Sequence, residues 1–286
     1  RADYRSLLAP FAQRPPGWWP AFFRHAAAKA LDADTVRYLY NLRRQSAQAP
    51  LQPEERAAFV RRLQRDGLVD DAYLVWMSGL DDKARAELGY LFNGGFEVSE
   101  DGGFGWRLAR HKQFSATPAA TLGATGKAAL RLRFSGFEGG FWHVWQPLVL
   151  EPGTYQVRGR VRLDSLRSAG GLRWAVRCQL PQSKVLAEGP RFVGASDWRE
   201  FDFRFEVPEG CTAQRLQLVS AGSRGFERQY DGMLWFDDLR ISRADTLDAV
   251  ARADAMARTN ENVPMRSGSS PQAADAAPSD VPATTR

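Results

Sequence analysis

Residues 155–164 read YQVRGRVRLD, and apolar and polar side chains alternate along this stretch. A period of two predicts a β-strand with one face turned to a core and the other to water. The same period recurs in residues 130–134 and 201–207, and turns such as Glu151-Pro152-Gly153 separate the runs. We therefore predict roughly eight or nine antiparallel strands in residues 91–244, folded as a β-sandwich of the jelly-roll type.

The part of the chain before this sandwich carries helical patterns instead. Pro53 and two acids stand where the first turn of a helix would begin, and Gly67 stands where it would end. Apolar side chains three and four positions apart predict further helices within residues 34–50, 69–77 and 81–91. Short helices joined by tight turns pack as antiparallel hairpins, so we predict a helical hairpin region here.

The predicted architecture is therefore α+β in three parts. The helical hairpin region spans residues 1–90, the sandwich spans 91–244, and a short helix followed by a tail spans 245–286. After Asn260 the chain has no aromatic residue and four prolines. Such a segment buries too little apolar surface to offset its ordering entropy, so we predict that the tail is disordered.

The net charge is +6, and arginine dominates it, with 34 Arg against 5 Lys. One interpretation is solvated surface, and the other is an anionic polymer as partner, such as an acidic polysaccharide, a lipid surface or a nucleic acid. No RNP, KH, zinc-finger or helix-turn-helix pattern is present, which disfavours nucleic acid. Several arginines stand on predicted strands: Arg131, Arg133, Arg158, Arg160, Arg162, Arg173 and Arg177. They either protect the sheets from pairing with other chains or bind carboxylates of an acidic polysaccharide.

The two cysteines, Cys178 and Cys211, belong to no CxxC motif and have no histidine at metal-ligand spacing. Each lies in or beside a predicted strand. They form either two buried thiols or one disulfide, and we favour free thiols because small sulfur side chains are common in protein cores.

Five short motifs follow one another in the second part of the chain. They are Asn93–Glu97, Gly126–Leu132, Val144–Tyr155, Asp197–Phe201 and Phe236–Leu239. In this order they resemble a jelly-roll carbohydrate-binding module of the xylan- and glucan-binding kind, within the galactose-binding-like fold. The helical region loosely resembles a degenerate tetratricopeptide pair. Helical repeats beside such a module also occur, by resemblance, in bacterial proteins associated with exopolysaccharide production.

Sugar binding needs flat apolar rings for the C–H faces of pyranoses and planar hydrogen-bonding groups for their edges. Six of the nine tryptophans lie in the predicted sandwich: Trp106, Trp142, Trp145, Trp174, Trp198 and Trp235. Any one of them could be a core residue. Their positions in the alternating pattern place some on one face of a strand and some on the other, so we do not expect all six to be buried. The aromatic side chains are densest in residues 139–146. The predicted carbohydrate-binding residues are Trp142, His143, Trp145, Gln146, Trp174, Arg177 and Gln179.

The resemblance also implies one structural Ca²⁺ between the first and last strands of the module. The matching side chains in this sequence are Glu97 and Asp237 or Asp238. Calcium prefers several oxygen ligands, which these residues and nearby carbonyls could supply. The alternative is that the three carboxylates cap turns or pair with arginines.

Catalysis finds little support in the sequence. No pair of acids stands out as a glycosidase pair, and the three histidines are far apart without an HxxxH or GxSxG motif. We therefore predict a non-enzyme that binds polysaccharide in bacterial exopolysaccharide or cell-envelope glycan production or export. The alternative is a protein–protein scaffold in which helices and sandwich both contact partners.

The location expected from this resemblance is the cell envelope, either periplasmic or anchored to a membrane. No stretch approaches the ~18 consecutive apolar residues of a membrane span. The chain begins with Arg1 rather than Met, so we expect any anchor to belong to a missing N-terminal segment.

Overall fold

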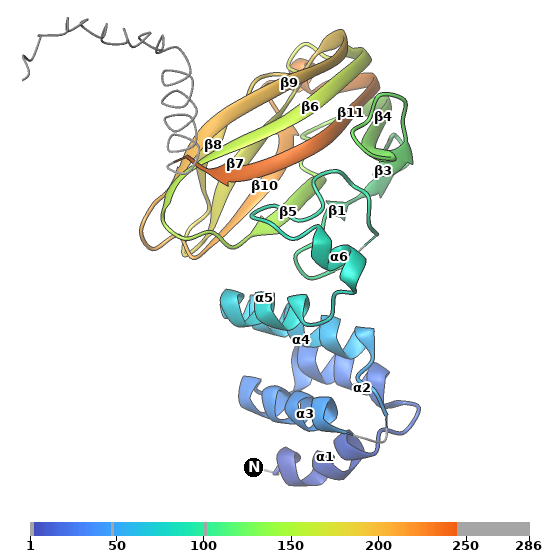
Figure 1. The fold of residues 1–286 in the computed structure, drawn as a ribbon, viewed down its shortest axis with the longest axis vertical. Helices are drawn as coiled ribbons and strands as arrows, with labels where there is room; N and C mark the ends of the chain where they lie inside the picture. Colours follow the sequence, from blue (N-terminus) through green and yellow to red (C-terminus); the bar gives the residue numbers. More distant parts are fainter. Residues whose placement is uncertain (1–2, 47–48, 100–101, 245–286) are drawn as a thin grey trace, which may run out of the picture. The chain divides into compact units, whose positions relative to one another are not determined.

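The computed structural model describes residues 3–46, 49–99 and 102–244, which lie within one compact unit, Arg1–Thr246. Helices come first and antiparallel sheets follow, which confirms the predicted α+β order (Figure 1). The helix and disordered tail predicted for residues 245–286 lie outside the described residues. None of the helices in the described ranges has the length and apolar character of a membrane span.

The helical region begins with short helices joined by tight turns. They are α1 (Tyr4–Gln13), α2 (Trp19–His25), a π-helical turn (Ala26–Ala30), α3 (Ala33–Gln45), α4 (Pro53–Arg65), α5 (Val69–Met77) and α6 (Asp82–Ala86). As predicted, α4 begins at Pro53, and the Glu55 carboxylate accepts the N–H of the residue before the helix at 2.8 Å. The last helix is shorter than the predicted segment 81–91. The N–H groups of Glu87 and Leu88 donate to carbonyls three residues back, which tightens the chain and ends the helix.

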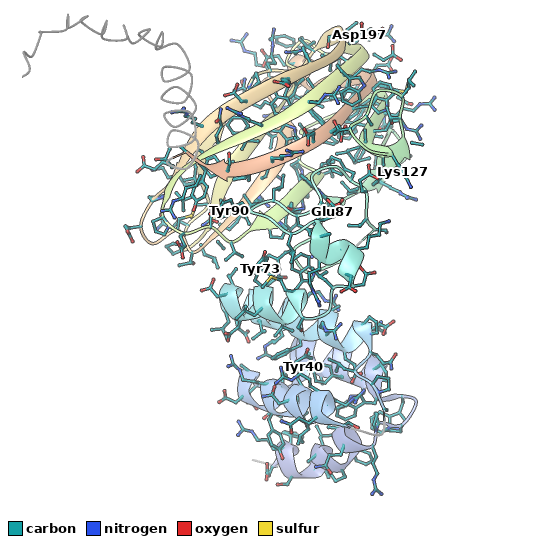
Figure 2. The ribbon with its side chains drawn as sticks, in the orientation of Figure 1. Tyr40, Tyr73, Glu87, Tyr90, Lys127 and Asp197 are labelled. Atoms are coloured by element: carbon teal, nitrogen blue, oxygen red, sulfur yellow. A yellow bond between two sulfur atoms is a disulfide. The ribbon has the colours of Figure 1, made fainter. Side chains whose placement is uncertain are left out.

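Buried aromatic side chains occupy the centre of the helical region. Tyr40 of α3 stacks on Phe59 of α4 with ring centroids 4.1 Å apart (Figure 2). Of the aromatic residues that precede Arg24, Trp19 and Phe23 are buried, whereas Trp18 is 49% exposed. One indole ring of the Trp-Trp pair is therefore core and the other lies at the surface.

Two antiparallel sheets form the sandwich. The strand order is β1-β5-β10-β7-β8 in the five-stranded sheet and β2-β3-β4-β11-β6-β9 in the six-stranded sheet. The bounds are β1 (Arg107–Leu108), β2 (Arg110–His111), β3 (Phe114–Ala120), β4 (Ala128–Glu138), β5 (Val144–Leu148), β6 (Gly153–Arg167), β7 (Leu172–Leu180), β8 (Lys184–Glu188), β9 (Gly194–Val207), β10 (Ala213–Ser220) and β11 (Gln229–Arg243). Apolar side chains from both sheets meet in one buried cluster, which confirms the predicted sandwich. The described residues hold eleven strands rather than eight or nine, because β1 and β2 have two residues each and are too short to show a period.

The first and last motifs of the sandwich meet at Gly94. The N–H of Leu239 on β11 donates to the Gly94 carbonyl at 3.0 Å. A Cβ on Gly94 would lie 1.7 Å from the Leu239 carbonyl oxygen, so only glycine fits this approach. Asn93 holds the same loop, because its side-chain oxygen accepts the N–H of Glu97 at 2.7 Å and its amide nitrogen donates to the Val98 carbonyl at 2.6 Å.

The loop that enters the sandwich also packs on the last long helix. The Trp76 ring of α5 lies edge-on to Phe92 at 5.0 Å and tilted to Phe104 at 5.7 Å. A Cβ on Gly103 would lie 2.0 Å from this ring, and Gly103 has a φ of +49°, so glycine is required there. The predicted boundary between residues 90 and 91 therefore lies inside a packed segment and stays a prediction.

The two cysteines form a disulfide, so the expectation of free thiols is wrong. Cys178 lies on β7 and Cys211 lies just before β10, with Cα atoms 5.8 Å apart. These strands are neighbours in the five-stranded sheet, and Cys178 is in register with Gln214. The separation of 33 residues in sequence conceals this proximity, which only strand pairing creates.

Candidate functional site

The outer face of the five-stranded sheet combines an aromatic ring with several arginines. On β5, β7 and β10 its side chains alternate with core residues such as Val144, Val176 and Leu216. We call this surface the basic face and define it by Arg107, Trp145, Pro147, Arg173, Arg177, Gln179, Glu188, Arg215 and Gln217. Because successive side chains point to opposite faces of a sheet, the apolar side chains of these strands are buried and the polar ones lie together on the outer face.

Trp145 lies on β5, next to the edge strand β1, and is half-buried. In register it stands between Arg107 on β1 and Gln217 on β10. The guanidinium carbons of Arg107 and Arg215 lie 5.9 and 5.6 Å from the centre of its ring. Both distances fall within the range of cation–π attraction. The two guanidinium groups lie over the Trp145 ring, but farther from its centre than Arg162 lies from the centre of the Trp235 ring.

Arg177 and Arg215 stand directly opposite each other on β7 and β10. The Nε atom of each is buried and has no hydrogen-bond partner. Burial, followed by the charge of Arg177, lowers the pKa of Arg215 below its ordinary value. In the part of the chain that the structure describes, neither guanidinium has a carboxylate partner. Two cations side by side with unused donors favour an acceptor from outside the chain.

The other polar groups of the face are already engaged. Arg173 Nη1 lies 2.5 Å from Glu188 Oε2, which neutralises the acid of the face. Gln217 Nε2 donates to the Trp142 carbonyl at 2.7 Å and is almost fully buried. Arg173 Nε is also buried without a hydrogen-bond partner, but Glu188 compensates the charge of that arginine. Arg177 and Arg215 have no such carboxylate among the described residues.

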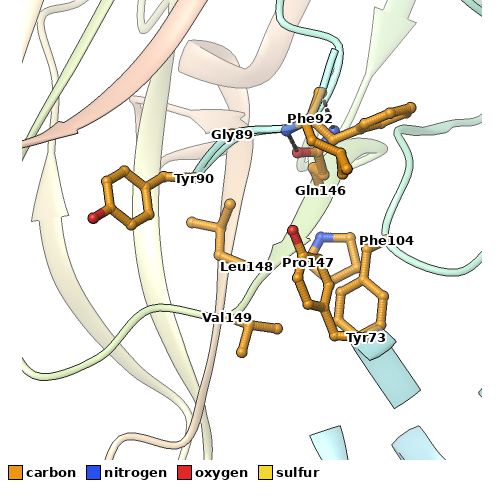
Figure 3. Close-up of a pocket in the computed structure, with 10 residues that line it drawn as sticks. Tyr73, Gly89, Tyr90, Phe92, Phe104, Gln146, Pro147, Leu148 and Val149 are labelled. Carbon is orange, nitrogen blue, oxygen red and sulfur yellow. Dashed lines mark hydrogen bonds between the residues drawn. The ribbon is translucent and has the colours of Figure 1, made fainter. Parts of the chain in front are cut away.

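An apolar cavity of about 460 Å³ adjoins the basic face at Pro147. Its walls include Tyr73 from α5, Phe104 from the entry loop, and Tyr90 (Figure 3). Tyr73 and Phe104 meet edge to face at 5.1 Å, and burial raises the pKa of Tyr73. The cavity offers aromatic surface next to a face rich in hydrogen-bond donors.

Three of the predicted carbohydrate-binding residues lie on the basic face: Trp145, Arg177 and Gln179. Trp142 is 57% exposed, and its ring stacks on His143 with centroids 4.6 Å apart. Residues 139–143 precede β5 and are not extended strand, so Trp142 does not follow the strand's alternation.

His143 is half-buried rather than part of the open surface. Its ring packs 4.7 Å from Phe114 and 5.3 Å from Phe141. Burial, with a smaller effect of the charge of His111, lowers the pKa of His143. A neutral imidazole among aromatic rings supports the edge of the core and leaves Trp142 as the exposed ring.

The structure places two of the predicted binding residues in the interior, which corrects their assignment. Trp174 is 0% exposed and packs in the core. Gln146 is 1% exposed, and its amide both accepts the N–H of Phe92 at 2.9 Å and donates to the carbonyl of Phe92 at 2.8 Å. A buried backbone segment needs such partners, so this glutamine is turned inward.

Five residues of the face were not predicted from the sequence: Arg107, Pro147, Glu188, Arg215 and Gln217. Arg215 and Gln217 alternate with Leu216 and Leu218 on β10, so the period of two could have placed them. Arg107 and Glu188 stand in or at the end of short strands and carry no comparable signal. Their place follows only from pairing with β5 and β7.

The outer face of the six-stranded sheet carries the predicted arginine ladder. Arg162 lies 4.4 Å from the centre of the Trp235 ring, and Trp235 is only 7% exposed. Arg160 lies 5.0 Å from the centre of the Trp198 ring. On this face too, arginines lie over tryptophan rings, and among its described residues no ring is as exposed as that of Trp142.

The three carboxylates predicted to hold calcium line one cavity of about 380 Å³. Glu97 Oε1 accepts two backbone N–H groups at 2.7 and 2.9 Å. Asp237 accepts the N–H of Thr125 on one oxygen and that of Asp238 on the other, at 2.6 and 2.7 Å. Asp238 Oδ1 lies 2.6 Å from the guanidinium of Arg240.

These contacts fit hydrogen-bonded turns better than a cation site. Oxygen ligands suit calcium, but these oxygens face N–H groups and an arginine. Arg160 Nη1 also lies 3.9 Å from Asp237 Oδ2. Within the described ranges, no group of three or more His, Cys, Asp or Glu residues is placed to hold a metal. The calcium ion implied by the resemblance stays a hypothesis, and the contacts favour its alternative, in which the three carboxylates cap turns and pair with arginine.

We expect thermal melts in calcium chloride and in EDTA to agree, because Asp237 and Glu97 are satisfied by backbone N–H groups. Asp237→Asn should lower the melting temperature equally in both solutions, since the amide cannot accept two N–H donors on equal terms. Asp231→Asn, at an exposed ion pair with Arg167, is the control. If EDTA lowers the melting temperature of the parent protein but not that of the Asp237→Asn variant, the calcium site would be supported instead.

Comparisons with known proteins give structural similarity only. No family model matches the chain, and no curated protein matches its sequence. A solved structure described as "CBM4 structure and function" is 16% identical, with a TM-score of 0.39, over 54% of this chain and 99% of its own. The CBM22-1–GH10 modules of a Clostridium thermocellum xylanase, crystallised with xylohexaose, are 17% identical, with a TM-score of 0.37. That match covers 54% of this chain and 28% of the xylanase chain. A tailspike protein of bacteriophage CBA120 is 13% identical, with a TM-score of 0.39, over 55% of this chain and 21% of its own.

Proposed function

We propose that the sandwich binds a polysaccharide on the basic face without cleaving it. The observation that carries the proposal is Trp145, a half-buried ring on the outer side of the five-stranded sheet, with the guanidinium groups of Arg107 and Arg215 next to it. A pyranose offers C–H groups to such a ring and hydroxyl groups to such donors. A flat face that spans several strands suits an extended chain of sugars better than a compact ligand.

The carboxylates of the face support binding rather than hydrolysis. A glycosidase needs two carboxyl groups across the scissile bond, about 5–9.5 Å apart. Among the described residues of the basic face, Glu188 is the acid, and Arg173 holds it in an ion pair at 2.5 Å. The face therefore offers an aromatic ring and hydrogen-bond donors, and its acid, Glu188, is held by Arg173 of the same face.

We place this activity outside the cytoplasm, in the cell envelope. The disulfide between Cys178 and Cys211 supports this location, because disulfides persist in oxidising compartments. A role in exopolysaccharide production or export is part of the same proposal and rests on the resemblance of the motifs.

A second candidate function, a protein–protein scaffold, is favoured by the surface of the helical region. Tyr4, Leu7 and Phe11 of α1 are 41–61% exposed and lie three and four positions apart, on one side of the helix. The exposed Trp18 ring lies 5.5 Å from Phe11. This apolar stripe fits a protein partner and leaves the basic face free for sugar. A scaffold alone would retain no glycan.

Trp145→Ala is expected to weaken polysaccharide binding by about 30-fold, the effect of losing an aromatic anchor worth about 2 kcal/mol. Affinity electrophoresis in gels that contain xylan, mixed-linkage β-glucan, polygalacturonate or alginate identifies which polysaccharide the protein binds. Calorimetry then measures the loss of affinity in the variant. Trp198→Ala is the matched control, because it removes a half-buried tryptophan beside an arginine on the opposite sheet.

Circular dichroism melts of both variants separate lost binding from lost folding. If Trp198→Ala loses binding and Trp145→Ala keeps it, the binding face is the other sheet. If the parent chain retains none of the four polysaccharides, the proposed function fails and the scaffold takes its place.

A further inference from the structure

We propose that the bound polysaccharide is a polyuronate, and that Arg177 and Arg215 together bind its carboxylate groups. This inference rests on the proposed function and names the substrate class of the same face. It starts from Arg177 and Arg215, which stand opposite each other and whose buried Nε atoms have no acceptor among the described residues.

The charge of the basic face is strongly one-sided. It holds four arginines, namely Arg107, Arg173, Arg177 and Arg215, against one acid, Glu188. Glu188 is bound by Arg173, so it neutralises neither member of the central pair. A neutral polysaccharide would leave this excess charge without compensation, whereas a polyanion would neutralise it.

The geometry of the pair costs stability in the free protein. Like charges directly opposite each other on neighbouring strands destabilise a sheet. Arg177 and Arg215 are such a pair, and the Nε atoms of both are buried without a partner. The lowered pKa of Arg215, from burial first and Arg177 second, reports the same cost. A carboxylate lying over the pair would satisfy both cations at once.

The position of Trp145 connects the charge to a sugar ring. Arg215 contributes to the central pair and also lies 5.6 Å from the centre of the Trp145 ring. In a uronic acid the carboxylate is attached directly to the pyranose ring. A uronate stacked on Trp145 therefore brings its carboxylate next to Arg215. The planar fork of arginine can bind a carboxylate with two parallel hydrogen bonds.

Arginines of the opposite sheet provide a control for net charge. Arg131 is exposed on β4, and in the described part of the chain it has no ion-pair partner. Arg131→Gln removes one positive charge from the molecule, as Arg215→Gln does, but from the other face. A purely long-range attraction would respond to both changes alike.

The test uses matched polymers with the full chain. Polygalacturonate and alginate are each compared with their carboxyl-reduced forms, which keep the backbone linkage and lose the charge. We expect the parent to bind one acidic polymer at least ~10-fold more tightly than its reduced form. Arg177→Gln and Arg215→Gln should each remove most of this difference and keep the weak binding of the reduced form. Arg131→Gln should behave as the parent.

Each outcome decides between the two proposals. Equal binding of acidic and reduced polymers would overturn the polyuronate inference and leave polysaccharide binding in place. No binding of any of these polymers, of xylan or of β-glucan would overturn both. Tighter binding of dextran sulfate than of polyuronate would overturn the choice of carboxylate. Melts that are unchanged or raised in the Gln variants are expected, because each relieves the repulsion of the pair.

Discussion

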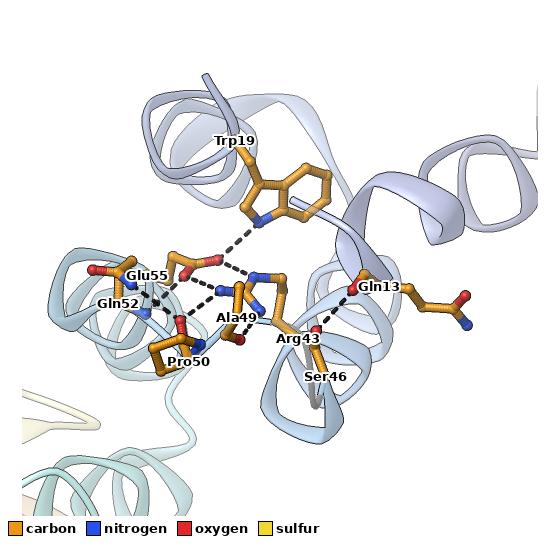
Figure 4. A network of polar contacts seen from close by, with 8 residues as sticks. All are labelled: Gln13, Trp19, Arg43, Ser46, Ala49, Pro50, Gln52 and Glu55. Carbon is orange, nitrogen blue, oxygen red and sulfur yellow. Dashed lines mark hydrogen bonds and ion pairs between the residues drawn. The ribbon is translucent and has the colours of Figure 1, made fainter. Parts of the chain in front are cut away.

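Glu55→Gln is expected to lower the free energy of unfolding of the helical region by about 3–5 kcal/mol, the cost of leaving a buried charge without its partner. Arg43 and Glu55 are 1% and 0% exposed, and their Nε and Oε1 atoms lie 2.7 Å apart (Figure 4). The same Glu55 oxygen accepts the indole N–H of Trp19 at 2.8 Å. Arg43 also donates to the carbonyl of Pro50 at 3.0 Å.

The physical reason is that one carboxylate holds three elements together. Glu55 lies in the first turn of α4, Arg43 lies in the last turn of α3, and Trp19 is the first residue of α2. A glutamine of the same shape can keep some hydrogen bonds, but the arginine charge then remains buried and uncompensated. The helices should lose their mutual packing before the sheets do.

Urea unfolding followed by circular dichroism at the helical band measures this loss. Asp71→Asn is the matched control, because it breaks the exposed ion pair with Arg37 and should cost only about 0.2–1 kcal/mol. Replacing both Arg43 and Glu55 with Met should recover part of the stability, since it removes both buried charges. Equal stability of the Glu55→Gln and Asp71→Asn variants would contradict the role of the buried pair.

Reduction of the disulfide is expected to lower the free energy of unfolding of the sandwich by about 3–4 kcal/mol, from the loop-closure entropy of a loop of this size. The bond joins residues 33 positions apart on neighbouring strands. The double variant Cys178→Ala and Cys211→Ala should unfold at the same urea concentration as the reduced parent.

The control is the double variant with and without reductant, which should show no difference. Maleimide labelling of intact cells reports the compartment, because an oxidised pair in the envelope leaves no thiol to label. An unchanged unfolding curve of the parent in reductant, together with full maleimide labelling, would contradict both the bond and the location.

Local patterns in the sequence predicted α3, α4, α5 and the long strands, but they assigned no helix to α1 or α2. The alternation of residues 155–164 predicts the strand β6, and Pro53 with its acids predicts the start of α4. Both signals depend on side chains within a few positions of one another, so no knowledge of distant residues is needed. The strands β1 and β2 escaped because two residues cannot show a period.

The candidate site was predictable only where a residue lies inside a regular strand. The alternation of β7 correctly predicts that Arg177 and Trp174 point to opposite faces of the sheet. Trp174 is on the buried face, so its assignment as a binding residue was wrong. Trp142 precedes β5, so the alternation of that strand does not predict where the Trp142 side chain points. Gln146 turns inward because the backbone of Phe92, 54 residues away in sequence, supplies its hydrogen bonds.

The sequence by itself determined which segments become helices and strands, and which side of each strand is polar. Only the tertiary structure decided that Arg215 stands opposite Arg177, that Cys178 meets Cys211 and that Glu55 neutralises Arg43. The reason is the range of the interactions. Periodicity is a property of neighbours along the chain, whereas strand register and buried charge pairs depend on elements brought together by the burial of a shared core.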